Sequence, residues 1–201
     1  PLLKAVPQKG GLVALQTEVS RIKSLSNNDV PVPQIINQSD DFILLSHLGN
    51  SVALQFKDKD NSQNHKQKLL TACLSAIKAV HEKDQCLSQA FVRNMVQMSD
   101  KPISIGFIDF EDDPQSVMSV SEAQARDVLL FINSAARFFI KDESFFQQTI
   151  TDFLNKHDPE VASLLHKTSQ RLQWITKLPF QKALGHDYEK LKLGLIAIRH
   201  L

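Results

Sequence analysis

The sequence predicts an α+β fold that is mostly helical. Two pairs of short β-like runs are each joined by a polar turn, which is the pattern of an antiparallel hairpin. The segments between and after these pairs carry apolar residues at helical spacing, and everything after Pro114 follows this period. The expected order is therefore helix, hairpin, helix, irregular loop, hairpin and a group of helices, with no internal repeat.

Length and composition are those of an ordinary globular protein. The 201 residues are 42% hydrophobic and 22% charged, which suits one sizeable domain or a large and a small lobe sharing a cleft. The formal net charge of +1 gives no reason to expect a nucleic-acid partner. The longest apolar runs are too short to span a bilayer, so we expect no transmembrane segment.

The cysteines and the first residues set expectations for the compartment. Cys73 and Cys86 match no zinc-binding spacing, and a chain of this size needs no disulfide. The chain opens without Met and without the long apolar stretch of a secretory signal. We therefore expect reduced thiols in a cytoplasmic protein, and an upstream segment that has been removed.

The first third of the chain predicts a helix followed by a hairpin. The helix runs from Leu12 to Leu25, and its apolar face is formed by Leu12, Leu15, Val19, Ile22 and Leu25. The prolines of Val30–Pro33 require extended backbone. Strands follow at Gln34–Ile36 and Phe42–His47, and Leu48-Gly49-Asn50 ends the second strand with a turn.

The middle of the chain predicts a longer helix and a second hairpin. The helix begins at Gln63, and its inward residues are Leu69, Leu70, Cys73, Ala76, Ile77 and Val80. The stretch 82–94 shows no regular period. The runs Met95–Met98 and Ile103–Ile108 then have the length and spacing of paired strands.

Helix-start signals divide the C-terminal region into four helices. Ser121 and Gln124 have the spacing of a capping box, and Asp142 is expected to cap the next helix. Asp158, followed by proline, marks a third start, and the last helix is expected at Asp187–His200. Core packing explains the phenylalanines near Asp142, although an exposed pair would favour a peripheral membrane or partner contact: Phe138, Phe139, Phe145 and Phe146.

Three strings in the middle of the chain carry the most information about function. A predicted helix ends in Val80-His81, a loop ends in Arg93-Asn94 before a strand, and the next strand ends in Ile108-Asp109-Phe110-Glu111. This order resembles the catalytic core of the protein-kinase-like superfamily. The resemblance is greatest to its bacterial lipopolysaccharide-kinase and RIO-like branch, in which a string such as Ile-Asp-Phe-Glu replaces Asp-Phe-Gly.

The resemblance covers residues 12–135 and implies both a lobe organisation and an ATP site. Residues 1–48 would form a truncated N-lobe, with a helix and a hairpin leading to the hinge. Residues 49–201 would form a mostly helical C-lobe that contains the catalytic-loop and metal-loop hairpin. Ser46 and Leu48, at the hinge, would face the adenine of ATP.

The resemblance also assigns metal-binding and charged roles. Asn94 would be the loop asparagine that helps to hold Mg²⁺, and Asp109 the carboxylate that ligates it, in agreement with the preference of Mg²⁺ for hard oxygen ligands. Glu18 matches the glutamate that pairs with a phosphate-binding lysine. Lys4, fourteen residues before Glu18, is one candidate for that lysine, and a residue upstream of this sequence is the other.

The departures from the family pattern concern the catalytic loop. Gln89 occupies the position of the catalytic base, and an amide cannot accept a proton at neutral pH. Leu87-Ser88 replaces the usual His-Gly, and no glycine-rich phosphate loop precedes the first helix. Arg93 is expected to anchor the loop to a carboxylate, for which Asp127 is a candidate. His81 is expected to be structural, at the C-terminus of its helix.

A bacterial subgroup of this superfamily shares a longer pattern with the chain. The matching residues are Arg93-Asn94, Ile105–Pro114, Val117-Met118 and Ala123–Asp127. Members of the subgroup also lack the loop aspartate, which implies that the altered base is a trait of the subgroup.

Three interpretations of the function stay open at this point. The first is a phosphotransferase that binds ATP and Mg²⁺ and phosphorylates a small molecule, an envelope sugar or a protein hydroxyl; the sequence does not identify the acceptor. The second is a pseudokinase that serves as a scaffold or binding module, which Gln89 favours. The third is a helical interaction domain in which Asp109–Asp113 is only an acidic turn.

Overall fold

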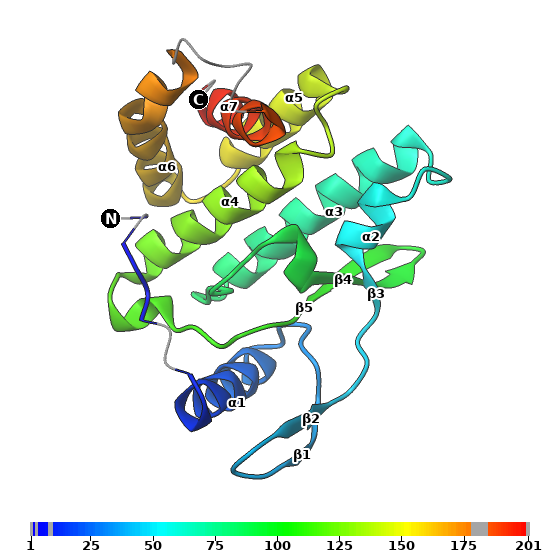
Figure 1. The fold of residues 1–201 in the computed structure, drawn as a ribbon, viewed down its shortest axis with the longest axis vertical. Helices are drawn as coiled ribbons and strands as arrows, with labels where there is room; N and C mark the ends of the chain where they lie inside the picture. Colours follow the sequence, from blue (N-terminus) through cyan, green and yellow to red (C-terminus); the bar gives the residue numbers. More distant parts are fainter. Residues whose placement is uncertain (1, 3, 8–9, 178–184, 200–201) are drawn as a thin grey trace.

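The computed structural model describes residues 2, 4–7, 10–177 and 185–199 (Figure 1). Its elements confirm the mostly helical α+β class and the expected order of helices and hairpins. In chain order they are α1 (Leu12–Asn27), β1 (Ile35–Gln38), β2 (Ile43–Leu45), β3 (Asn50–Ser51), α2 (Val52–Lys57), α3 (Gln63–His81), the 3₁₀ helix η1 (Val92–Asn94), β4 (Met95–Asp100), β5 (Ile103–Phe107), η2 (Pro114–Ser116), α4 (Val120–Ala136), α5 (Glu143–Leu154), α6 (Pro159–Leu172), η3 (Gln173–Lys177) and α7 (Gly185–Arg199).

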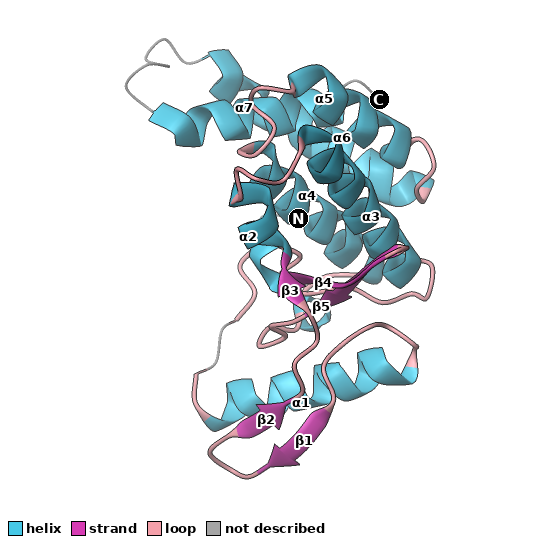
Figure 2. Ribbon diagram, turned by 90° about the vertical axis from the view of Figure 1, so that its right-hand side faces the viewer, coloured by secondary structure: helices cyan, strands magenta, loops and turns pink. Residues whose placement is uncertain are grey.

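Helix α1 and the β1–β2 hairpin lie together at one end of the molecule (Figure 2). The two strands pair antiparallel with Ile35 opposite Leu45, and an irregularity after Ile35 shifts the register. Both of these side chains pack against the main core. Part of the apolar surface at this end stays exposed, on Leu12, Val13, Ile36, Phe42 and Leu44. Leu12 was expected to be inward, but it lies at the N-terminal end of α1 and stays exposed, since none of the described elements covers it.

Backbone and side-chain hydrogen bonds tie this end to the rest of the molecule. The Phe107 N–H of β5 donates to the Pro31 carbonyl at 2.9 Å. The Lys83 ammonium donates to the Asp29 carbonyl at 2.9 Å, beyond the C-terminus of α1. The proline-rich segment after α1 therefore runs beside the strand that ends just before Asp109.

The second sheet has three antiparallel strands in the order β3-β4-β5. The β4–β5 hairpin was predicted from the sequence, whereas β3 and α2 were not. Helix α2 has six residues, too few to display a helical period, and it begins where the Ser51 hydroxyl accepts a hydrogen bond from the Leu54 N–H. Its buried residues are Val52 and Phe56.

Helices α3 and α4 supply most of the main core. The inward residues expected on α3 are buried, except for the half-buried Ala76. On α4 the buried face includes Val128, Phe131 and Ile132. The phenylalanines after α4 belong to this core, since the rings of Phe139 and Phe146 are stacked with centroids 5.6 Å apart and both are fully buried. The core-packing explanation therefore holds for this pair.

Two predicted helix caps differ from the structure. The capping box of α4 is formed by Ser119 and Glu122, because the same four-residue spacing occurs two residues earlier than expected. Gln124 instead turns inward and donates to the carbonyls of His81 and Gln85. Asp142 precedes α5, but its carboxylate accepts hydrogen bonds from two glutamines of α3, Gln63 and Gln67.

The last two starts agree more closely with expectation. The Asp158 carboxylate caps α6 by accepting from the Glu160 and Val161 N–H groups. Helix α7 begins two residues before the predicted Asp187, and the predicted end at His200 lies outside the described residues. In the part of the chain that the structure describes, no helix is long and apolar enough to cross a membrane.

Gly49 permits the close approach of β3 to β4. A Cβ atom added at Gly49 would lie 2.3 Å from the Gln97 carbonyl oxygen, which belongs to the backbone and cannot rotate away. We expect Gly49→Ala to lower the free energy of unfolding by about 2 kcal/mol, because overpacking forces the backbone to shift. Urea unfolding measures this effect. Gly10→Ala is the control, since nothing lies within 4 Å of its added Cβ; equal stability of the two variants would contradict the prediction.

Candidate functional site

Three segments converge on the region singled out by the sequence. They are α1, the loop 82–94, and the segment 108–118 that follows β5 (Figure 1). The loop and the post-strand segment are adjacent because each flanks the β4–β5 hairpin, on its two outer ends. Helix α1 reaches the same place through its Glu18 and Arg21 side chains.

Asn94 and Asp109 are brought together by backbone pairing. The Ile108 N–H donates to the Asn94 carbonyl at 3.0 Å, one residue before Asp109. Asn94 is buried, and its side-chain amide donates to the Gln89 carbonyl at 3.0 Å, which closes the loop on itself. The amide nitrogen therefore holds the Asn94 side chain in place. The amide oxygen is the atom of this side chain that could bind a hard cation.

The backbone at Asp109 is in the left-handed region, with φ of 72°. Such a conformation is uncommon for residues other than glycine and costs free energy, so it persists only where the surroundings impose it. The neighbouring Phe110 imposes it here, since its side chain is 1% exposed in the main core. Ser88, directly before Gln89, has φ of 70° and is also buried. One strained residue, Asp109, is thus a predicted metal ligand, and the other, Ser88, adjoins Gln89.

Glu18 of α1 lies beside the segment that carries Asp109. Burial raises the pKa of the Glu18 carboxyl, and the charges of Glu111 and Asp109 raise it further, while a hydrogen bond from the Phe110 N–H opposes them. The predicted glutamate is therefore in contact with the predicted metal segment. Burial is the main cause of the raised pKa, and a bound cation would relieve the smaller part that comes from the charges of Glu111 and Asp109.

Lys4 lies elsewhere. Its ammonium donates to the Val117 carbonyl at 2.7 Å. The carbonyls of Leu2 and Lys4 accept from the Arg126 guanidinium of α4, so this segment runs along the larger part of the molecule. Among the described residues Lys4 and Glu18 form no ion pair, and the partner expected for Glu18 is not supplied by Lys4 in this arrangement.

Gln89, which the resemblance places at the position of the catalytic base, is held by a carboxylate. Its amide nitrogen donates to Asp112 at 2.8 Å, and Asp112 is buried. The Arg93 guanidinium lies 3.5 Å from the Gln89 amide oxygen and 4.4 Å from the centre of the Phe91 ring. Arg93 is exposed and contacts its own loop, so the expected anchor to Asp127 is not formed. The sequence grouped Asp112 with an acidic turn and gave no sign of its contact with Gln89.

Ser46 and Leu48, which the resemblance places at a hinge, lie between the β1–β2 hairpin and β3. Ser46 pairs with Gln34 twice, because its N–H donates to the Gln34 carbonyl and its hydroxyl accepts from the Gln34 N–H, each at 2.9 Å. Leu48 packs on β5, where a Cβ added at Gly106 would lie 2.5 Å from its methyl group. Leu48 is therefore next to the strand that ends before Asp109, whereas the Ser46 hydroxyl is engaged in the hairpin.

Asp127 holds the loop as a candidate anchoring carboxylate should, but through the Leu87 N–H and not through Arg93. Its fully buried carboxylate accepts from the Leu87 N–H at 2.6 Å and lies 3.3 Å from the His81 ring nitrogen Nε2. His81 Nδ1 lies 3.0 Å from His157 Nε2, and His157 Nδ1 accepts from the Asp158 N–H at 2.8 Å. The inward helical position of Asp127, next to Val128, was the one available signal.

These contacts fix the tautomers of both imidazoles. His157 Nδ1 accepts a hydrogen bond, so its single proton is on Nε2 and is donated to His81 Nδ1. The proton of His81 is then on Nε2 and is donated to Asp127. Burial, and after it the neighbouring His81, lower the pKa of His157 to about 4. Protonation of His157 would place a proton on its Nδ1 and end the hydrogen bond from the Asp158 N–H.

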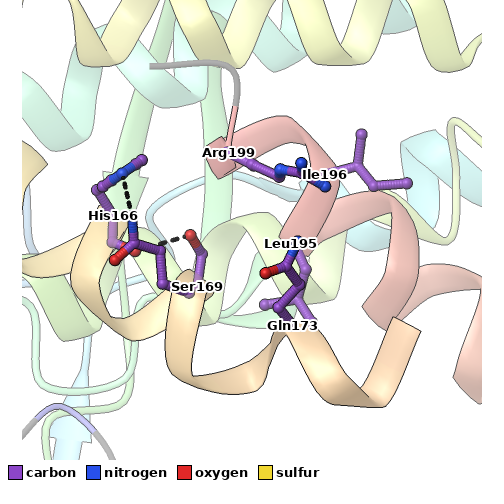
Figure 3. Close-up of a pocket in the computed structure, with 7 residues that line it drawn as sticks. His166, Ser169, Gln173, Leu195, Ile196 and Arg199 are labelled. Carbon is purple, nitrogen blue, oxygen red and sulfur yellow. Dashed lines mark hydrogen bonds between the residues drawn. The ribbon is translucent and has the colours of Figure 1, made fainter. Parts of the chain in front are cut away.

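Two cavities differ in their relation to this region. One of about 490 Å³ lies at the N-terminal end of α1 and is lined by four carboxylates, those of Glu18, Asp40, Asp41 and Glu111. The other, of about 240 Å³, lies between α6 and α7 (Figure 3) and is lined by His166, Ser169, Gln170, Gln173, Leu195, Ile196 and Arg199. No residue of the predicted site lines the second cavity. Within the described ranges, no three His, Cys, Asp or Glu side chains are arranged to hold a metal ion.

The comparisons with known proteins give no functional name. No protein-family model matches the sequence. A protein of Haemophilus influenzae strain Rd, named only as uncharacterized, is 25% identical over 189 residues, which cover 92% of this chain and 74% of that protein. The chain is thus similar to a bacterial protein of comparable extent, and its function has to be argued from its own residues.

The Gln89–Asp112 contact predicts the result of restoring an acidic base. In Gln89→Asp two carboxylates would face each other near the core, and we expect a loss of about 2 kcal/mol in the free energy of unfolding at pH 7. Adding Asp112→Asn should recover most of the loss, because the new amide can donate to the new carboxylate. Denaturant unfolding of the two single variants and the double variant measures the coupling. Additive effects would contradict the contact.

The His81–His157 contact predicts a loss of stability in acid. His157 has a folded pKa of about 4, below the usual value of 6.5, so the unfolded chain binds more protons between these values. The stabilisation by neutral His157 is therefore complete above pH 6.5 and is lost as the pH falls towards 4. We expect His157→Gln to remove this part of the pH dependence, measured by urea unfolding from pH 7.5 to 4. Exposed His47→Gln is the control, and parallel profiles for wild type and His157→Gln would refute the prediction.

Proposed function

We propose that the chain is a kinase-like phosphotransferase domain that binds ATP with Mg²⁺ through Asn94 and Asp109. The observation that carries the proposal is the hydrogen bond between the Ile108 N–H and the Asn94 carbonyl, because it makes the two predicted metal ligands neighbours. A small part built from α1 and a hairpin, joined to a helical part with its own hairpin, supports the same proposal. So does the position of Glu18 beside the Asp109 segment.

The donor set fits a magnesium ion carried by a nucleotide. Mg²⁺ usually takes one or two protein oxygens and fills its remaining positions with phosphate oxygens and water. A carboxylate from Asp109 and an amide oxygen from Asn94 meet that need without a three-carboxylate cage. When bound, Mg²⁺ would neutralise phosphate charge. The protein's own contribution is positional: Phe110 fixes the backbone of Asp109, and Gln89 fixes Asn94.

The nucleotide base would lie against Leu48 at the hinge. Leu48 packs on Gly106 of β5, two residues before Ile108, so the same strand would support the base and the metal end of the nucleotide. Ser46 is hydrogen-bonded to Gln34. An adenine would have to replace one of these hydrogen bonds in order to bind Ser46. Since Lys4 bonds to Val117, the cation opposite Glu18 would have to come from another part of the protein or from the metal itself.

The position of the catalytic base holds a residue that cannot accept the proton of the acceptor hydroxyl. Gln89 cannot act as a base, and it is engaged with Asp112. Phosphoryl transfer depends mainly on positioning and charge neutralisation, so the loss of a base slows the reaction without forbidding it. A hydroxyl on a small molecule, an envelope sugar or a protein would be the acceptor.

A second candidate function is a pseudokinase that binds partners and transfers no phosphate. The same Gln89–Asp112 contact favours it, because the position of the base has become a structural link between the loop and the acidic segment. Retained Mg²⁺–ATP binding is compatible with either function. Transfer of phosphate from ATP to an acceptor distinguishes the two.

Asp109→Asn tests the nucleotide site and the strain together. Asparagine tolerates the left-handed backbone and removes a charge that faces Glu18, so the free protein should gain about 1 kcal/mol, or ~3 °C in unfolding midpoint. Mg²⁺–ATP at a hundred times its Kd should stabilise the wild type by about 2.7 kcal/mol and the variant much less. Thermal unfolding with ATP, with and without Mg²⁺, measures both effects.

The matched control is Asp84→Asn. Asp84 also has a left-handed backbone, with φ of 54°, and it is exposed near the start of the loop 82–94, ten residues before Asn94. It should keep the full response to Mg²⁺–ATP. A wild type that shows no response to Mg²⁺–ATP, or an Asp109→Asn variant with an undiminished response, would overturn the proposed nucleotide site.

A further inference from the structure

Arg21 is a buried cation without a counter-charge in the described part of the chain. It lies on α1 with 7% of its surface exposed. Its guanidinium donates to the Cys86 carbonyl and lies 3.5 Å from the Cys86 sulfur. No ion pair to Arg21 occurs among the described residues, and its Nε has no hydrogen-bond partner there.

This arrangement is an expensive way to fill a core position. Burying a charge without a partner of opposite sign costs free energy, and an apolar side chain of similar volume is often more stable at such a place. The neighbouring α1 residues Ile22 and Leu25 fill the same core with apolar side chains. The charge at Arg21 therefore needs a reason other than stability.

Cys86 connects Arg21 to both halves of the candidate site. It is fully buried, three residues before Gln89, in the loop that ends at Asn94. Its sulfur lies 4.0 Å from the side-chain oxygen of Gln115, in the segment that follows the acidic string. Burial raises the pKa of Cys86 to about 12, so this group is a neutral thiol that packs and donates, not a reactive thiolate.

Glu18 and Arg21 act from the same face of α1. They are three residues apart, which places them one above the other on a helix. Glu18 accepts the Phe110 N–H of the metal segment, and Arg21 donates to the Cys86 carbonyl of the loop. One turn of α1 thus contacts both segments of the candidate site: the segment with Asp109 and the loop that ends at Asn94.

We propose that Arg21 is a positioning residue: it fixes α1 on the loop at Cys86, and through α1 it holds Glu18 against the Phe110 N–H. This inference rests on the proposed function only for its consequence, the alignment of Asp109 and Asn94 for Mg²⁺–ATP. The geometric part concerns the free protein. It predicts that the hydrogen bond from the Phe110 N–H to Glu18 depends on Arg21, which contacts Cys86 and lies one helical turn away from Glu18.

The experiment compares Arg21→Met, Arg21→Lys and the control Lys23→Met, whose residue is exposed on the same helix. Amide hydrogen exchange at Phe110 and the Kd for Mg²⁺–ATP are the two measurements. We expect Arg21→Met to speed exchange at Phe110 about tenfold and to weaken Mg²⁺–ATP about tenfold, without lowering the unfolding midpoint. Arg21→Lys keeps the charge and a donor for the Cys86 carbonyl, so it should recover most of the protection.

Other outcomes separate this inference from the proposed function. Unchanged exchange at Phe110 in Arg21→Met overturns the inference, and so does uniformly faster exchange with a lower unfolding midpoint, which would make Arg21 an ordinary core residue. Faster exchange at Phe110 together with an unchanged Kd for Mg²⁺–ATP would show that Arg21 does not align Asp109 and Asn94 for the nucleotide. A wild type that does not bind Mg²⁺–ATP refutes the proposed function, while the exchange at Phe110 still decides the geometric part.

Discussion

The backbone pairing of Ile108 with Asn94 is the contact on which the candidate site depends. It joins the end of the irregular loop to the end of β5, so Asn94 and Asp109, fifteen positions apart in the sequence, become neighbours. Separate interactions hold the two segments that it joins. Asp127 of α4 accepts a hydrogen bond from the Leu87 N–H of the loop, and the buried Phe110 holds the segment after β5. The site is thus built on rigid elements even though its residues lie in irregular backbone.

The same region concentrates the unfavourable features of the molecule. Asp109 and Ser88 have left-handed backbones, Glu18 faces like charges, and Arg21 is a buried cation without a counter-charge among the described residues. Each feature costs stability, and a protein selected only for packing would have replaced it. Their convergence on one place supports our proposal of a ligand site there, and the excess of carboxylates favours a cationic ligand.

Local signals predicted the regular elements well, because helices and hairpins of ordinary length leave a period in the sequence. The six-residue α2 left none, and the α4 cap was misplaced because two overlapping four-residue patterns compete there. For the site, the resemblance to the kinase-like superfamily is what indicated Asn94, Asp109 and Glu18. Contacts between distant segments left no local signal, so the partners Asp112 for Gln89 and Cys86 for Arg21 could be found only in three dimensions.

The most direct test of the central claim is a titration of the labelled protein with Mn²⁺ and ATP, followed by NMR. Mn²⁺ prefers the same oxygen ligands as Mg²⁺, and its unpaired electrons broaden the signals of nearby nuclei. The account predicts selective broadening of the Asn94 side-chain amide and the Asp109 backbone amide, only when ATP is present, and none at Lys4. Broadening confined to the exposed Asp40 and Asp41, with Asn94 and Asp109 unaffected, would contradict it.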